Sequence, residues 1–136
     1  MGIFYKEFAL KKVLECGAAK SWEKIKVGDT VQLILNLEDY NLTGLKKQVG
    51  VLFVKVEEEI EKIIGIIPEE EGKFIKDFLD MGWDDEILFS AIISQNDDTK
   101  PLENRFKVAV YIERFIDVKE KLKEKIEKID TVQNFV

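Results

Sequence analysis

Apolar and polar residues alternate along several short stretches of the chain, which is the pattern expected of strands that bury one face. The clearest alternation covers residues 30–37 and 105–113, where apolar side chains occupy every second position. Two denser stretches, residues 49–56 and 60–67, are rich in β-branched and aromatic residues, as buried strands usually are. Residues 86–94 have a similar composition. We therefore predict a strand in each of these segments.

Residues 6–15, which precede these segments, have an ambiguous pattern. They mix Phe8, Leu10 and Val13 with charged side chains, at a spacing that fits either a first strand or a short helix. The periodicity does not decide between the two. If the segment is a strand, it is the first of six.

A helical period follows residues 60–67. Pro68 suits the first turn of a helix, and the glutamates at 69–71 suit its positive N-terminal end. Gly82 is expected to end this helix in the left-handed conformation. The apolar stripe of the helix comprises Phe74, Ile75, Phe78, Leu79 and Met81.

A second helix is predicted over residues 117–130. Its apolar residues form a narrow seam, flanked by lysines and glutamates at spacings that allow ion pairs along the helix. The seam comprises Val118, Leu122, Ile126 and Ile129. Two interpretations stay open, because the seam either packs back on the sheet or associates with a second copy or another protein.

Together these elements predict an α+β fold that is mainly β, in the order β-β-β-β-α-β-β-α. Short turns link most of the strands and one helix is embedded among them. This arrangement is typical of a small six-stranded partly closed barrel or curled sheet. We expect one domain over residues 1–115, followed by a C-terminal amphipathic helix and tail over residues 116–136.

The composition agrees with a small globular domain. The chain has 136 residues, of which 46% are hydrophobic and 35% charged. It contains no apolar run of about 18 residues, the length that a membrane-spanning helix needs. Its first residues lack the apolar core of a secretory signal, and Cys16 is the only cysteine, so that no internal disulfide can form. We expect a cytoplasmic protein without a membrane partner.

Charge and residue types narrow the functional classes. The formal net charge of −6 disfavours non-specific binding to a nucleic-acid duplex. Histidine is absent, which removes the commonest general base and metal ligand. The acidic clusters at 84–86 and 96–98 do not have the spacing of a calcium loop, and Cys16 has no histidine to activate it. We expect no catalytic residue, no metal site and no cofactor.

A series of short motifs follows the predicted elements in order. It comprises a Gly-Asp turn before a strand (Gly28 and Asp29), a Glu-x-x-Asn loop (Glu38 and Asn41), a hydrophobic strand (residues 51–54), a Gly-x-Ile-Pro step (residues 65–68), and a helix ending in glycine that precedes a strand (residues 74–82, then 87–93). With these motifs, the chain between residues 6 and 113 resembles the HIRAN domain. The resemblance implies a small barrel similar to an OB-fold. It also implies a binding function, which in some members is the recognition of a single-stranded DNA end.

The sequence departs from that family where those members contact DNA. They carry an arginine and an aromatic residue after the first strand, where this chain has Cys-Gly-Ala-Ala at 16–19. They carry a Tyr-Asp pair where Thr43 and Gly44 stand here, and an aromatic ring at the position of Ile66. A flipped-out base needs a flat ring for stacking and a donor for its phosphate. The resemblance therefore supports the fold more than the DNA-end activity.

Candidate ligand-binding residues lie in two loops. One loop offers a ring for a base and cations for a phosphate through Tyr40, Asn41, Lys46 and Lys47. Its plainer interpretation is an ordinary polar loop with a turn. The other offers Trp22 and Lys20, and here the plainer interpretation is a tryptophan that closes one end of the core. Trp83 is interpreted as a core residue for the same reason.

The sequence therefore predicts a non-catalytic, HIRAN-like binding module that recognises single-stranded nucleic acid or a DNA-processing partner. The alternative is a protein–protein interaction or assembly domain. That domain would bind another protein or form a homodimer through the C-terminal helix or a sheet edge.

Overall fold

Six antiparallel strands form one sheet in the order β1-β6-β5-β2-β3-β4. The computed structural model describes residues 2–16, 22–35, 37, 48–83 and 88–133. The strands are β1 (Ile3–Ala9), β2 (Thr30–Ile34), β3 (Gly50–Lys55), β4 (Ile60–Ile66), β5 (Phe89–Asn96) and β6 (Phe106–Ile112). The α+β, mainly β fold class is thus confirmed, and residues 6–9, which the sequence left open, belong to a strand.

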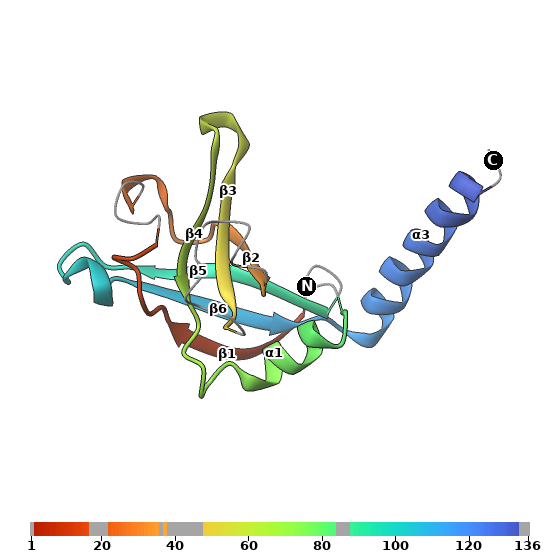
Figure 1. Cartoon of the computed structure of the whole chain (residues 1–136), viewed down its shortest axis with the longest axis horizontal. Helices are drawn as coiled ribbons and strands as arrows, with labels where there is room; N and C mark the ends of the chain where they lie inside the picture. The colour runs from red at the N-terminus through yellow and green to blue at the C-terminus, as the bar shows by residue number, and fades with distance from the viewer. Residues whose placement is uncertain (1, 17–21, 36, 38–47, 84–87, 134–136) are drawn as a thin grey trace.

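The sheet curls because β2 divides its pairing between two neighbours. Thr30 and Val31 pair with β5, whereas Gln32–Ile34 pair with β3. As a result the β3–β4 hairpin stands across the other strands, as Figure 1 shows. Among the described residues, a single bridge between Lys11 and Ile66 joins the chain after β1 to β4, with N–O distances of 2.9 and 3.0 Å. Of the two predicted forms, the curled sheet is the one observed, since the sheet is not closed into a barrel.

The core lies inside this curl and follows the alternation read from the sequence. In β2, Val31 and Leu33 are buried, and in β6 the buried set includes Phe106, Val108 and Val110. A smaller apolar cluster comprises Cys16, Leu37, Leu52, Ile63 and Ile66. Burial of one strand face is what fixes the register of such a sheet.

The embedded helix α1 (Lys73–Asp80) begins later than predicted. Pro68 does not start it, because residues 68–72 form a separate turn in which the amide of Gly72 donates to the Pro68 carbonyl at 2.9 Å. A Cβ at Gly72 would lie 2.9 Å from the Ile67 side chain, so this turn packs tightly against the end of β4. The glutamates at 69–71 therefore precede the helix, and their assignment to its first turn is wrong. Gly82 follows the helix with φ +90°, as predicted.

The face that α1 buries is narrower than the predicted stripe. Ile75 is wholly buried, and the rings of Phe74 and Phe78 each lie 6.2 Å from the ring of Phe89. Met81, by contrast, is 71% exposed and lies outside the packed face. The helix thus covers the start of β5 with aromatic contacts.

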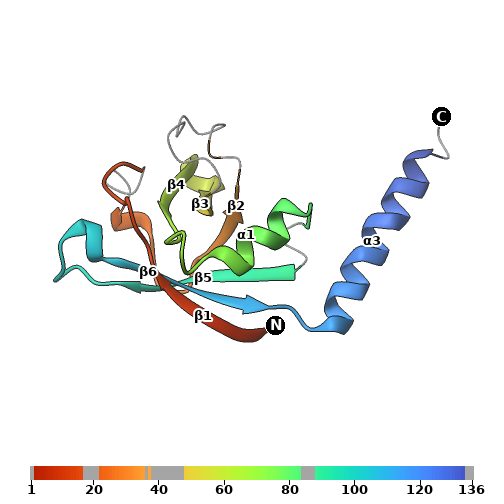
Figure 2. The ribbon, with the colours of Figure 1, turned by 60° about the horizontal axis from the view of Figure 1, so that its bottom comes forward.

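The C-terminal helix α3 (Phe115–Gln133) extends the predicted helix at both ends. It follows β6 directly and projects away from the sheet, as the two views in Figures 1 and 2 agree. The seam therefore does not pack back on the sheet at Ile126, which is 58% exposed. No helix in the described part of the chain is both long and apolar enough to cross a lipid bilayer.

Candidate functional site

The first turns of α3 and the residues Trp83 and Leu88 line an apolar cleft of about 540 Å³. Its lining residues are Trp83, Leu88, Glu113, Val118, Lys119 and Leu122. The backbone amide of Glu113 donates to the Leu88 carbonyl at 2.9 Å, which extends the β5–β6 ladder to the start of the helix. This hydrogen bond places the first turn of α3 beside Leu88.

A second hollow of about 470 Å³ continues along α3. It is lined by Lys119, Leu122, Lys123, Ile126 and Glu127, so that it shares Lys119 and Leu122 with the cleft. We refer to the two together as the α3 hollow. The hollow has side chains from α3 along its length and Trp83 and Leu88 at one end.

Three residues of the predicted seam line the α3 hollow. Val118 and Leu122 are partly buried, and Ile126 is 58% exposed. The side chain of Ile129 lies outside the described residues. Spacing along the helix was a sufficient signal for these positions, because residues three or four apart share one face.

Trp83 and Leu88 were missed as site residues. Trp83 is only partly buried, and its side chain helps to form the cleft. No local pattern predicts this role, since it depends on the direction in which α3 leaves β6. The nearest signal was the position of Trp83 directly after Gly82, where the chain turns out of α1.

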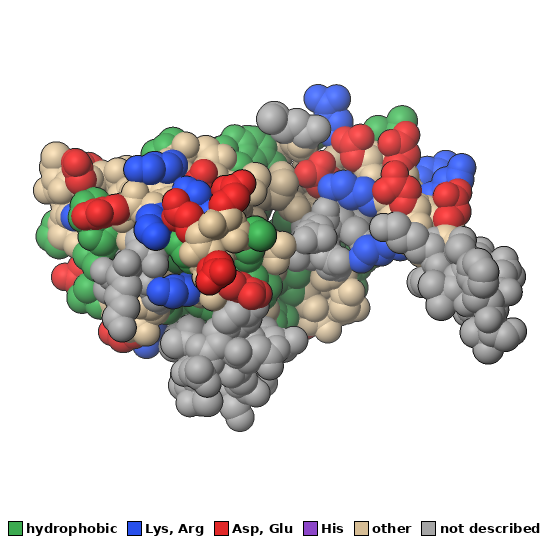
Figure 3. All heavy atoms as spheres, turned by 90° about the horizontal axis from the view of Figure 1, so that it is seen from above, with side chains coloured by type: hydrophobic (Ala, Val, Ile, Leu, Met, Phe, Trp, Pro, Cys, Tyr) green, Lys and Arg blue, Asp and Glu red, His purple; other side chains and the backbone are tan. Residues whose placement is uncertain are grey.

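Charged side chains surround the apolar residues of α3. Figure 3 shows lysine and carboxylate side chains interspersed along the helix, at the right of the view. Lys121 lies 4.0 Å from Glu113, whose side chain is 7% exposed. Within the described residues, Lys119 and Lys123 take part in no ion pair. Within the part of the chain that the structure describes, Lys119 and Lys123 are thus two cations at the edge of the α3 hollow without an ion-pair partner.

The predicted nucleic-acid loop is not part of this arrangement. Tyr40, Asn41, Lys46, Lys47 and Lys20 lie outside the described residues, so the structure does not place them.

The remaining candidate, Trp22, is partly buried and packs against the core. The guanidinium carbon of Arg105 lies 4.3 Å from the centroid of its ring. The side-chain amide of Asn96 donates to the Trp22 carbonyl at 3.1 Å, which fixes the backbone below that ring. An arginine and the core therefore occupy the surfaces that a stacked base would use.

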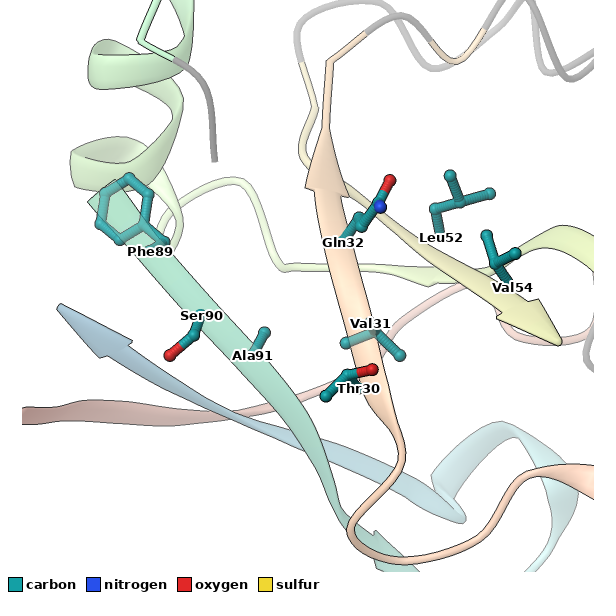
Figure 4. Close-up of a pocket in the computed structure, with 8 residues that line it drawn as sticks. All are labelled: Thr30, Val31, Gln32, Leu52, Val54, Phe89, Ser90 and Ala91. Atoms are coloured by element: carbon teal, nitrogen blue, oxygen red, sulfur yellow. The ribbon is translucent and has the colours of Figure 1, made fainter. Parts of the chain in front are cut away.

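Figure 4 shows a third hollow, of about 280 Å³, where β2 leaves β5. Thr30, Gln32 and Ser90 supply its polar groups, and the remaining lining is apolar. Its lining has no charged side chain to hold a phosphate and no general base to activate a hydroxyl. The residue types that line this hollow are therefore those of an ordinary sheet surface rather than those of an active site.

Cys16 is buried in the smaller apolar cluster. Burial, with a smaller contribution from the charge of Glu15, raises the pKa of its thiol to about 11. The thiol therefore stays protonated at neutral pH, and the structural interpretation of this cysteine agrees with its surroundings. No three metal-ligating side chains converge within the part of the chain that the structure describes.

The chain matches no family model, no curated protein and no solved structure. Its function is accordingly argued from the geometry of the α3 hollow.

Proposed function

We propose that this chain is a non-catalytic binding module that holds a helical segment of another protein in the α3 hollow. The observation that carries the proposal is the exposure of the seam, because Ile126 is 58% exposed and Val118 and Leu122 are only partly buried on a helix that projects into solvent. Apolar side chains gathered on one exposed surface are typical of protein-binding sites. A groove lined in this way suits the apolar face of an amphipathic helix.

The lining of the cleft supports this proposal further. Trp83 and Leu88 supply one wall and Val118 and Leu122 the other, so a single large apolar side chain of a partner would be enclosed on two sides. Enclosed apolar anchors contribute most of the binding energy in many protein interfaces. The remainder of the seam, up to Ile126, extends the contact along about two turns of helix.

The test uses a designed amphipathic peptide with a leucine stripe and uncharged glutamine flanks. We expect calorimetry to detect binding to the full chain, and the fluorescence of Trp83 to change on binding in a Trp22→Phe background. Leu122→Glu should abolish both signals, whereas Glu124→Gln, on the opposite face of α3, should leave them unchanged. Absence of binding by every amphipathic peptide, whatever its charge, would contradict the proposal.

The HIRAN-like nucleic-acid function stays a prediction. Its loop residues lie outside the described residues, and the chain carries a net charge of −6. A titration with labelled single-stranded oligonucleotides at low salt tests it independently of the α3 hollow, with either free end available. Salt-sensitive binding that Leu122→Glu does not change would support it, and no binding would remove it.

A further inference from the structure

The charges around the seam of α3 follow a regular arrangement when the helix is viewed along its axis. At about 100° per residue, Lys119 and Lys123 lie about 60° and 100° from Leu122 on one side. Lys125 and Lys121 lie at the same angles on the other side. Each flank of the apolar seam is therefore basic.

The carboxylates of α3 lie mainly on the opposite face. Glu120 and Glu124 are each about 160° from Leu122 at the same helical repeat. Two carboxylates do reach the α3 hollow, but Glu113 is paired with Lys121, and Glu127 already takes part in interactions within the protein. Lys119 and Lys123, both exposed, remain the cations available at the edge of the hollow among the described residues.

This arrangement disfavours a second copy of the chain as the occupant. If two α3 helices met through their seams in antiparallel orientation, each lysine flank would face the same flank of the partner. In parallel orientation, the Lys119–Lys123 flank would face the Lys121–Lys125 flank. Either orientation places lysines against lysines, and such flanking charges select which helices pair.

We infer that the α3 hollow takes an amphipathic helix of a different protein, whose apolar stripe is flanked by aspartate and glutamate. This inference rests on the proposed function and specifies the charge of the partner. Carboxylates on the partner would reach Lys119 and Lys123 while its apolar side chains enter the cleft between Trp83 and Val118. The lysines then select the partner, and the apolar contacts hold it.

A lipid surface is the other occupant that suits an apolar seam with lysine flanks. The shape of the site favours a helix instead. The apolar surface is a hollow between α3 and the side chains of Trp83 and Leu88, and a ridge of side chains fits a hollow better than a flat bilayer does.

The experiment compares three peptides with the same leucine stripe and with glutamate, glutamine or lysine flanks. Two exposed ion pairs of ordinary strength correspond to about tenfold in affinity, so the glutamate peptide should bind the full chain about tenfold more tightly than the glutamine peptide. The Lys119→Gln, Lys123→Gln double variant should abolish this advantage, and so should high salt. The Lys26→Gln, Lys100→Gln double variant makes the same change in charge at exposed positions outside the hollow and should retain it.

Four results would overturn the inference. Equal binding of the three peptides would leave the α3 hollow as a protein-binding site without charge selection, so that the proposed function would stand. Self-association that Leu122→Glu abolishes, measured by light scattering, would identify a second copy as the occupant. Binding to anionic phosphatidylserine vesicles that requires Lys119 and Lys123, without preference for the glutamate peptide, would identify a lipid surface. Failure of all three peptides would contradict the proposed function as well.

Discussion

The curled sheet and α3 differ in how far their apolar side chains are buried. In the sheet, the chain covers its own apolar face, and residues such as Phe53, Ile64 and Ile93 are almost completely buried. In α3, a seam of comparable residue types remains partly open, with Ile126 more than half exposed. The comparison indicates that the sheet determines the stability of the protein, whereas α3 is the element that we propose binds a partner. Substitutions in the two regions should therefore have different consequences.

The largest effect on stability is expected from the core beneath α1. Ile75→Ala removes a completely buried side chain and should lower the free energy of unfolding by about 2–5 kcal/mol. Met81→Ala, just after the same helix but 71% exposed, should change it by less than about 0.5 kcal/mol. Urea denaturation monitored by circular dichroism measures both. Similar losses for the two variants would show that α1 does not cover the core as described.

Cysteine reactivity compares the two regions without removing a contact. A thiol with a pKa of about 11, rather than the usual 9.0, has about 100-fold less thiolate at pH 8. Cys16 should therefore be labelled slowly by iodoacetamide, with a rate that rises about tenfold per pH unit until the pH approaches that pKa. A cysteine introduced by Glu120→Cys on the exposed face of α3, in a Cys16→Ser background, should react at an ordinary rate. Equal rates at the two positions would contradict the burial of Cys16.

The contact between Arg105 and Trp22 gives a smaller effect. Arg105→Gln removes the guanidinium above the ring and a hydrogen bond from Nη2 to the Lys100 carbonyl, 3.1 Å long. We expect a loss of about 1 kcal/mol in the free energy of unfolding. Arg114→Gln, which changes an exposed arginine at the start of α3, serves as the control and should have almost no effect. If Arg105→Gln were neutral and increased oligonucleotide binding, Trp22 would instead be a stacking surface held closed by the arginine.

The smallest change in stability is expected at the seam itself. Ile126→Glu should alter the free energy of unfolding by less than about 0.5 kcal/mol, because its side chain is already 58% exposed. The same variant should lose most of its affinity for the glutamine-flanked peptide. Thermal unfolding and calorimetry on one protein preparation separate the two quantities. A loss of stability similar to that of Ile75→Ala would mean that the seam belongs to the core.

The sequence predicted the strands well because alternation is a local signal with a direct physical cause. A strand such as β6 presents every second side chain to one face, so the positions of Phe106, Val108 and Val110 suffice to identify it. The start of α1 could not be predicted in this way. Pro68 and the following glutamates have helical preferences, but the tight approach of Gly72 to Ile67 inserts a turn before the helix.

Only part of the candidate site could be predicted from the sequence. The seam positions Val118, Leu122 and Ile126 follow from helical spacing, whereas the cleft depends on tertiary geometry. Trp83 becomes part of it because the Glu113 amide continues the β5–β6 ladder and sets the direction of α3. The sequence of residues 83–88 by itself does not predict the direction in which α3 leaves β6. The loop at 38–47, which attracted the nucleic-acid prediction, lies outside the described residues and leaves that prediction untested.

The position of β6 has a mechanical consequence for any partner held by α3. β6 is paired on both sides, with β1 and with β5, and it continues directly into the helix. A force applied through α3 along the direction of β6 acts across hydrogen bonds that lie perpendicular to the strand. Two full ladders must then shear together before the strand is extracted. Tension applied through α3 is therefore expected to load both ladders of β6 together, rather than to peel a strand from the edge of the sheet.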